Sequence, residues 1–438
     1  MRPEASPLHK LLTDVVRIAT SKKEIKRLFR VPLYSSASYM AVANGVNSLL
    51  GFAFWIMVAR FYSTEDVGLA SAALAATGLL ASLAHLGLGM GLIRFLPGSQ
   101  NRSPMLNTAF TIGLITSVLA AVIFIAGLRL WSPALVFIRE DPFYLAAFVL
   151  FTVAATLSIH VNEALLAQRR ANLVLAKNLV FSLLKLALPL ILVTFLHSLG
   201  IFASWGIATW VALLLSFFLF LPRSEAGYRP FFVIKREVVS HMFHFSFANY
   251  LSELFWGLAG SILPIMVLSQ LGAEPNAYFY IAWTTAGVLS LLPTAISISL
   301  FAEGCYDEGR LAINIRRSLK MAFVLLVPAV ILTLIIADKL LLMFGSAYSE
   351  SGSLLLRIMA VSTLPLTVNL IYLGIKRVQK KLSLIIGMPA LVAVLSVGLG
   401  YLLLPRWGIA AAGIAWLISQ TVVALAIAAK WLREGGIR

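Results

Sequence analysis

Long apolar segments separated by short polar loops run from residue 38 almost to the end of the chain. A helix needs roughly 20 residues, at 1.5 Å each, to cross about 30 Å of hydrocarbon. The segments therefore predict twelve membrane-spanning helices, six in each half of the chain. Their expected spans are 38–59, 67–92, 107–128, 143–163, 174–197 and 201–221, then 243–270, 277–300, 318–337, 353–374, 383–404 and 408–429.

The two halves resemble each other in sequence. The polar segment 168–173 and the hydrophobic segment after it match 379–384 and its continuation, and 200–210 matches 408–416. An offset this constant indicates an internal duplication. Because each half holds an even number of spans, both halves begin on the same side of the membrane. We therefore expect an all-α membrane protein with two six-helix lobes, related by a parallel pseudo-twofold axis around a central cavity.

The loops divide the chain into five parts. We expect a basic cytoplasmic N-terminal segment at 1–37, an N-lobe at 38–221, an interlobe linker at 222–242, a C-lobe at 243–429 and a cytoplasmic tail at 430–438. Apolar residues recur at helical spacing over 8–19, which predicts a helix on the membrane surface. A disordered basic tail is the alternative.

Composition and charge narrow the class of protein. Hydrophobic residues make up 60% of the chain and charged residues 12%, which excludes a soluble globular protein. The net charge of +17 does not indicate nucleic acid, because 28 of the 35 Lys and Arg residues fall in alternate loops. That asymmetry is the positive-inside pattern, and it predicts that both termini are cytoplasmic in the cell membrane. Cys305 is the single cysteine, so an intramolecular disulfide is excluded.

Signatures of catalysis are missing from the sequence. It contains no phosphate-binding glycine loop, no His-Glu-x-x-His motif and no nucleophile elbow. His85, His160 and Glu163 lie on the second and fourth expected helices, but their spacing matches no metal site. We therefore expect a protein that is not an enzyme and needs no cofactor or metal.

Lys185 is the most unusual residue of the apolar segments. It lies eight residues beyond Lys177, hence roughly 12 Å further along the fifth helix. An ionised side chain at that depth costs at least about 2.5 kcal/mol unless it faces water or a partner. One interpretation is a cationic contact for an anionic substrate in the central cavity. The other is a structural ion pair or a cation that reaches the lipid headgroups.

Glu253 is the other deep charge, on the seventh helix at a similar depth. It is a candidate for ion coupling or gating, either by pairing with Lys185 across the lobes in one conformation or by taking up a proton. A static pair or a polar packing contact is the alternative.

Five further polar residues are candidates for the lining of the cavity. Arg357 lies one turn into the tenth helix, where it is an outer contact for an anion or extends to the membrane interface. Arg60 and Arg94 lie at helix ends and allow the same two interpretations. Asn44 and Asn249 occupy matching positions in the first helix of each lobe, where they would bind sugar hydroxyls or pack between helices.

Several motifs resemble a known family. They are Val58–Ser63, Leu86–Gly89 leading to Leu92–Phe95, Leu342–Tyr348 and Arg377–Lys381. Together with the length, the helix count and the repeat, they resemble polysaccharide transporters of the O-antigen flippase type. This family lies within the multidrug/oligosaccharidyl-lipid/polysaccharide exporter superfamily, which also holds the lipid II flippase and the multidrug and toxin extrusion antiporters.

The resemblance implies that the chain flips a polyprenyl-diphosphate-linked oligosaccharide from the inner to the outer leaflet by alternating access. It also implies a cationic cavity, with Lys185 and Arg357 as its contacts for the diphosphate. The implied partners are membrane lipids, a coupling cation, and a glycan polymerase or glycosyltransferases. Two alternatives stay open: a cation-coupled drug or metabolite antiporter of the same fold, and a membrane glycosyltransferase or polymerase.

Overall fold

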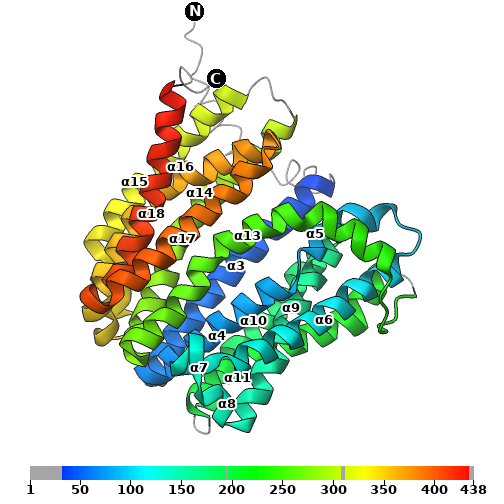
Figure 1. The fold of residues 1–438 in the computed structure, drawn as a ribbon, viewed down its shortest axis with the longest axis horizontal. Helices are drawn as coiled ribbons and strands as arrows, with labels where there is room; N and C mark the ends of the chain where they lie inside the picture. Colours follow the sequence, from blue (N-terminus) through cyan, green and yellow to red (C-terminus); the bar gives the residue numbers. More distant parts are fainter. Residues whose placement is uncertain (1–31, 194–195, 226, 307–310, 434–438) are drawn as a thin grey trace, which may run out of the picture.

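The computed structural model describes residues 32–193, 196–225, 227–306 and 311–433, and within them it is helical and without strands (Figure 1). The long helices of the first half are α3 (Pro32–Phe61), α4 (Thr64–Ala84), α5 (Leu88–Phe95), α6 (Arg102–Ala126), α9 (Pro142–Ala167), α10 (Ala171–Leu192) and α11 (His197–Leu215). Short turns of helix between them are η1 (Leu96–Gly98), α7 (Leu128–Trp131), η2 (Pro133–Leu135), α8 (Phe137–Glu140), the π-turn η3 (Ser216–Phe220) and α12 (Leu221–Ser224). The second half contains α13 (Arg236–Leu271), α14 (Ala273–Tyr306), α15 (Leu311–Leu342), α16 (Ser346–Val378), α17 (Leu382–Trp407) and α18 (Ala410–Arg433).

The predicted fold class is confirmed. Eleven helical segments in the described part of the chain are long and apolar enough to cross a membrane, and α3 lies at the one remaining expected span, 38–59. The described residues of each expected span are mainly helical, because a chain in hydrocarbon must satisfy its backbone hydrogen bonds within each segment. The surface helix expected at 8–19 lies outside the described residues. The second expected span is divided into α4 and α5, and α13 begins inside the expected linker.

The internal repeat appears in the backbone as well as in the sequence. Arg169, between α9 and α10, has a φ of 58°, and Lys380, at the matching turn between α16 and α17, has a φ of 54°. In both turns the next residue donates its N–H to a carbonyl five residues earlier, Arg170 to Leu165 and Lys381 to Lys376. Such bonds close a helix through a left-handed residue. The two halves therefore share a turn as well as a hydrophobic pattern.

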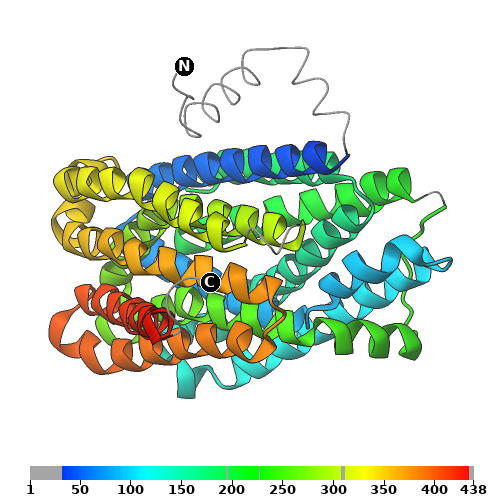
Figure 2. The same ribbon diagram turned by 90° about the horizontal axis from the view of Figure 1, so that it is seen from above.

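The lobes lie side by side, and α13 lies between them. Helices α14 to α18 pack against one another, as do α3, α6, α9, α10 and α11 (Figures 1 and 2). The first helix of the C-lobe, α13, also packs along α4 and α5 of the N-lobe, and α14 packs against α4. At the start of α4 the backbones come very close, because a Cβ on Gly68 would lie 1.8 Å from the carbonyl oxygen of Ala273. Asn276 donates from Nδ2 to the carbonyl oxygen of Gly68 (2.7 Å) at the same place.

Candidate functional site

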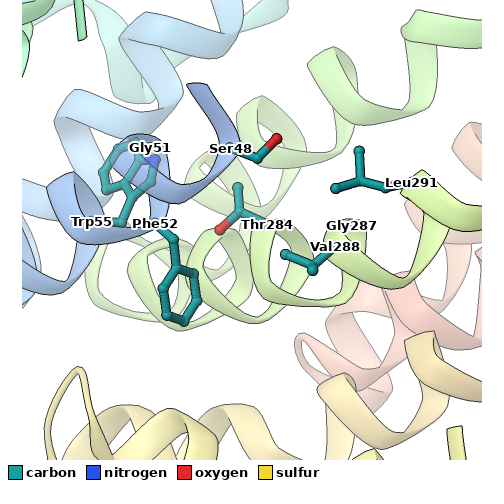
Figure 3. A pocket seen from close by; sticks show the side chains of 8 residues that line it. All are labelled: Ser48, Gly51, Phe52, Trp55, Thr284, Gly287, Val288 and Leu291. Carbon is teal, nitrogen blue, oxygen red and sulfur yellow. The ribbon is translucent and has the colours of Figure 1, made fainter. Parts of the chain in front are cut away.

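A small hollow lies at the seam between the lobes, where α3 faces α14. Its volume is about 250 Å³. At ~30 Å³ for each water, it holds roughly eight water molecules. The hydroxyls of Ser48 and Thr284 provide its polar side chains, one from each lobe (Figure 3). The remaining lining residues are Gly51, Phe52 and Trp55 of α3 and Gly287, Val288 and Leu291 of α14. The predicted cavity between the lobes is therefore present, but its walls are more apolar than the sequence analysis assumed.

Lys185 lies directly behind this hollow. Its side chain is 6% exposed, and Nζ lies 5.1 Å from the ring centre of Phe54 and 4.8 Å from that of Phe181. A Cβ on Gly51 would lie 4.0 Å from Nζ, so Gly51 faces both the hollow and the lysine. The ammonium is stabilised by the two aromatic faces and by no ion pair within the described part of the chain. It points neither to lipid nor to Glu253.

Lys177 is the deep cation that the sequence analysis missed. It lies within the expected fifth span but was not among the candidate residues, and it is 2% exposed. Its Nζ donates to the carbonyl oxygen of Ser158 (3.0 Å), to Ser158 Oγ (2.5 Å) and to Asn162 Oδ1 (2.8 Å). An ammonium has three protons, so this set of acceptors uses all of them.

A second, more polar cavity of about 460 Å³ lies inside the N-lobe around Lys177. Amides and hydroxyls line it, together with the rings of Phe181 and Trp205. Phe181 is also the ring against which Lys185 lies, so one aromatic side chain separates the two lysines. The polar lining residues are Asn47, Ser82, Ser158, Asn162, Asn178 and Thr209.

Arg60 joins the two lobes at the end where α3 passes into α4. Its Nε donates to the carbonyl oxygen of Met343 (2.9 Å), and its Nη2 donates to that of Leu342 (2.8 Å). These carbonyls lie at the C-terminal end of α15. The last carbonyl groups of a helix have no N–H donor within the helix, and the negative end of the helix dipole favours a cation there. The structure thus places Arg60 in an interlobe contact instead of on the wall of the hollow.

The remaining candidate residues occupy three different places. Arg357 packs within the C-lobe, where Nε donates to the carbonyl oxygen of Leu334 (3.1 Å) and Nη2 lies 3.6 Å from Asp338. Arg94 is exposed at the end of α5. The side chains of Asn44 and Asn249 lie outside those that the structure describes.

Glu253 is exposed on α13, where the charges acting on it are those of Arg377 on α16 and Glu163 on α9. Its neighbours therefore come from both lobes. Sequence reasoning had paired it with Lys185, and no ion pair joins those two residues in the described part of the chain. Counting residues along each helix places Lys185 and Glu253 at a similar depth in the membrane. The rotation of each helix about its axis, however, directs the two side chains to different neighbours.

Tyr62, in the turn between α3 and α4, fixes this turn to α10. Its hydroxyl is buried and donates to the carbonyl oxygen of Pro189 (2.8 Å). Burial, followed by the negative charge of Asp66, raises the pKa of Tyr62 to about 12. The hydroxyl therefore stays protonated and donates at any physiological pH.

Comparison with protein families decides the family. The model of the family described as polysaccharide biosynthesis protein matches residues 57–353, about two thirds of the chain. The chain belongs to this polysaccharide biosynthesis family. The resemblance seen in the sequence motifs is thereby confirmed. Among curated proteins, none matches the chain.

Several solved structures are similar in fold to this polysaccharide biosynthesis family member. The lipid II flippase MurJ in an inward closed conformation is 10% identical with a TM-score of 0.73, over 88% of this chain and 85% of that one. An inward-facing multidrug resistance MATE transporter of the MOP superfamily is 16% identical with a TM-score of 0.64, over 89% and 96%. A MOP superfamily transporter from Pyrococcus furiosus, described as having a binding pocket of reverse polarity, is 15% identical with a TM-score of 0.63, over 91% and 95%.

The polysaccharide biosynthesis family member is thus a multi-pass membrane protein with the fold of transporters and flippases. Two features of its site suit transport. A hollow lies at the seam of the lobes, and polar contacts join the lobes near the turn between α3 and α4 and, at another place, between Tyr250 and Leu83. Such contacts can form and break as rigid lobes rotate about their interface.

Proposed function

We propose that this chain flips a polyprenyl-diphosphate-linked oligosaccharide from the cytoplasmic to the outer leaflet of the cell membrane by alternating access between its two lobes. The observation that supports this most directly is the hollow between α3 and α14, with the Lys185 ammonium behind Gly51. A cation beside an interlobe passage suits an anionic head group. The family match and the fold support a flippase or transporter as the broader class.

The physical need for such a protein lies in the head group. A glycan that crosses hydrocarbon loses the hydrogen bonds of many hydroxyls, and each loss costs a few kcal/mol. A passage between two lobes supplies water and polar groups while the lipid tail stays in the bilayer. With the cell interior negative, moving a doubly charged diphosphate outward gains about 4.6 kcal/mol per 100 mV. The membrane potential would then favour export without a coupled ion.

The structure corresponds, in this proposal, to a state closed at the outer end. The bonds of Arg60 to the end of α15 and of Asn276 to Gly68 join the lobes there. The hollow of about 250 Å³ is too small for an oligosaccharide, so loading requires the lobes to separate along α3 and α14. Release on the outer side then requires the Arg60 bonds to break.

The test is flipping of a lipid-linked oligosaccharide by the purified chain in proteoliposomes. Substitution of Lys185→Met removes the charge and keeps the side-chain length, and Lys185→Arg keeps the charge. We expect flipping by the native chain, a loss of about tenfold or more in Lys185→Met, and a smaller loss in Lys185→Arg, because a hydrogen bond to a charged group is worth about 1.5–3 kcal/mol and only the arginine keeps a charge for the diphosphate. A native chain that flips no such lipid would contradict the proposal.

Two other outcomes would replace the proposed function. Efflux of organic cations by the same proteoliposomes would indicate the antiporter. Transfer of glycans between lipid carriers in detergent would indicate the glycosyltransferase or polymerase. Comparing Glu253→Gln with the native chain, with and without a proton gradient, tests whether Glu253 couples transport to protons. An equal response of both proteins to the gradient removes that role.

A further inference from the structure

The second membrane span of the N-lobe is interrupted between α4 and α5. Leu86 and Gly87 have positive φ angles of 51° and 68°. The N–H of Gly87 donates to Nδ1 of His85 (3.0 Å), whereas in a continuous α-helix it would donate to the carbonyl oxygen of Leu83. A ring nitrogen that accepts a hydrogen bond carries no proton. The interruption in this form therefore requires a neutral His85.

The interruption leaves two carbonyl groups without their helical donors. The carbonyl oxygen of Leu83 accepts from the hydroxyl of Tyr250 (2.9 Å), and that of Ala84 accepts from Thr116 Oγ1 (2.6 Å). The rings of His85 and Tyr250 meet edge to face at 5.2 Å. Because Tyr250 belongs to α13, one of these bonds joins the C-lobe to the N-lobe. While Gly87 donates to His85, the hydroxyl of Tyr250 takes the place of the helical donor to the carbonyl of Leu83.

The N–H of Gly87 thus has two possible acceptors, and each defines a different state. With a proton on Nδ1, His85 can only donate, and the N–H of Gly87 turns to the carbonyl of Leu83. Helices α4 and α5 then join into one, and Tyr250 shares the carbonyl of Leu83 with Gly87, which weakens the interlobe bond. The C-lobe already contains the joined form, because α14, the counterpart of α4 and α5, is one helix from Ala273 to Tyr306.

A partly buried acid, Glu163, is the candidate counter-ion for a protonated His85. Glu163 on α9 is among the charged groups that act on His85, and its Oε2 has no hydrogen-bond partner in the described part of the chain. The backbone leaves space for this acid, because a Cβ on Gly89 would lie 1.2 Å from Oε2. A desolvated carboxylate without donors favours a nearby cation.

The other groups around His85 come from every neighbouring helix. His160 on α9 lies with its ring 6.2 Å from that of His85 and with its Nδ1 3.6 Å from Glu163, and a charge on His160 would oppose one on His85. Lys177 of α10 bonds to Ser158 and Asn162 of α9. Helix α6 contributes Gly113 and Thr116, and the more distant charges are Glu253 of α13 and Arg377 of α16. His241 and His244 of α13 have side chains outside those described.

We propose that the interruption between α4 and α5 is a proton-binding site that controls an interlobe contact. Nδ1 of His85 takes up a proton from water, Glu163 serves as the counter-ion, α4 and α5 join, and the bond from Tyr250 of the C-lobe to the carbonyl of Leu83 is weakened by competition. The switch is a choice of one backbone N–H between two acceptors, and it does not depend on which substrate the protein carries.

Spin-label distances in the full chain test this proposal. Spin labels are attached at Gln100→Cys and Gly257→Cys in a Cys305→Ser background, and the distance between them reports the separation of the N-lobe from α13. Both positions are exposed, and a Cβ on Gly257 would meet no other atom within 4 Å. In nanodiscs we expect the distance distribution to shift between about pH 8 and about pH 4.5. The variant His85→Gln should keep the distribution of high pH at both values, because a glutamine oxygen accepts from Gly87 but takes up no proton.

Three further variants separate the proposal from other causes. Tyr250→Phe should show the low-pH distribution at every pH, because it lacks the hydroxyl. Glu163→Gln should move the transition to lower pH, because the counter-ion is lost. The double variant His241→Gln/His244→Gln should keep the native transition. A pH-dependent shift that persists in His85→Gln, or a native chain with no shift, overturns the proposal.

Discussion

Loss of the Arg60 contact should open the end of the molecule at which α3 passes into α4. Arg60→Met removes two hydrogen bonds to the end of α15, of 2.9 and 2.8 Å. Bonds to a charged donor contribute about 1.5–3 kcal/mol each when buried. Arg60 is exposed, so we discount each to about 0.5–1 kcal/mol. The total of about 1–2 kcal/mol changes the ratio of closed to open molecules roughly 5- to 30-fold.

The assay is the distance between spin labels at Glu65→Cys on α4 and Ser351→Cys on α16, both exposed, in a Cys305→Ser background. We expect a new population at longer distance in Arg60→Met. A smaller one is expected in Arg60→Lys, because an ammonium lacks the planar fork that reaches two carbonyls. Arg129→Met, which removes another exposed arginine of the N-lobe, is the control and should match the native chain. An unchanged distribution in Arg60→Met would refute the assignment of Arg60 to this interlobe contact.

Three further substitutions test the packing of the N-lobe by thermal unfolding in detergent. Gly89→Ala should destabilise by about 1–3 kcal/mol, because its Cβ would lie 1.2 Å from Glu163, and Gly89→Ala/Glu163→Ala should recover most of the loss. Tyr62→Phe should cost about 1 kcal/mol. Since the pKa of Tyr62 is raised to about 12, its contribution is complete below about pH 10 and is lost as the pH rises towards 12. The native chain should therefore lose more stability than Tyr62→Phe over that range. Lys177→Met should cost about 1–3 kcal/mol, since three part-buried acceptors lose their charged donor.

The sequence by itself determined the twelve spans, the repeat and the family. Each follows from a property that acts along the chain. The bilayer requires about 20 apolar residues per span, so the position of each helix can be predicted from a run of consecutive apolar residues. The duplication is likewise readable from matched segments such as 168–173 and 379–384.

The details of the site depended on rotation about helix axes and on contacts between distant segments. Lys177 and Lys185 are two turns apart on one helix, yet one is surrounded by amide and carbonyl oxygens and the other by aromatic rings. Arg60 has its partners more than 280 residues away. The sequence contains no signal for either environment. Only Gly87 is compatible with the interruption of the second span, because glycine disfavours a helix interior.

The interruption of the second span illustrates the same division. Residues 67–92 are predominantly apolar and predict one helix. The reason for the break is found only in the tertiary structure. There, the hydroxyls of Tyr250 on α13 and Thr116 on α6 donate to the carbonyls of Leu83 and Ala84, which the break leaves without helical donors. Hydropathy determines where the chain crosses the membrane, since the free energy of transferring a segment into lipid depends on the residues of that segment. Which polar groups meet inside was decided by packing, since a buried donor or acceptor is satisfied by whatever the fold brings within about 3 Å.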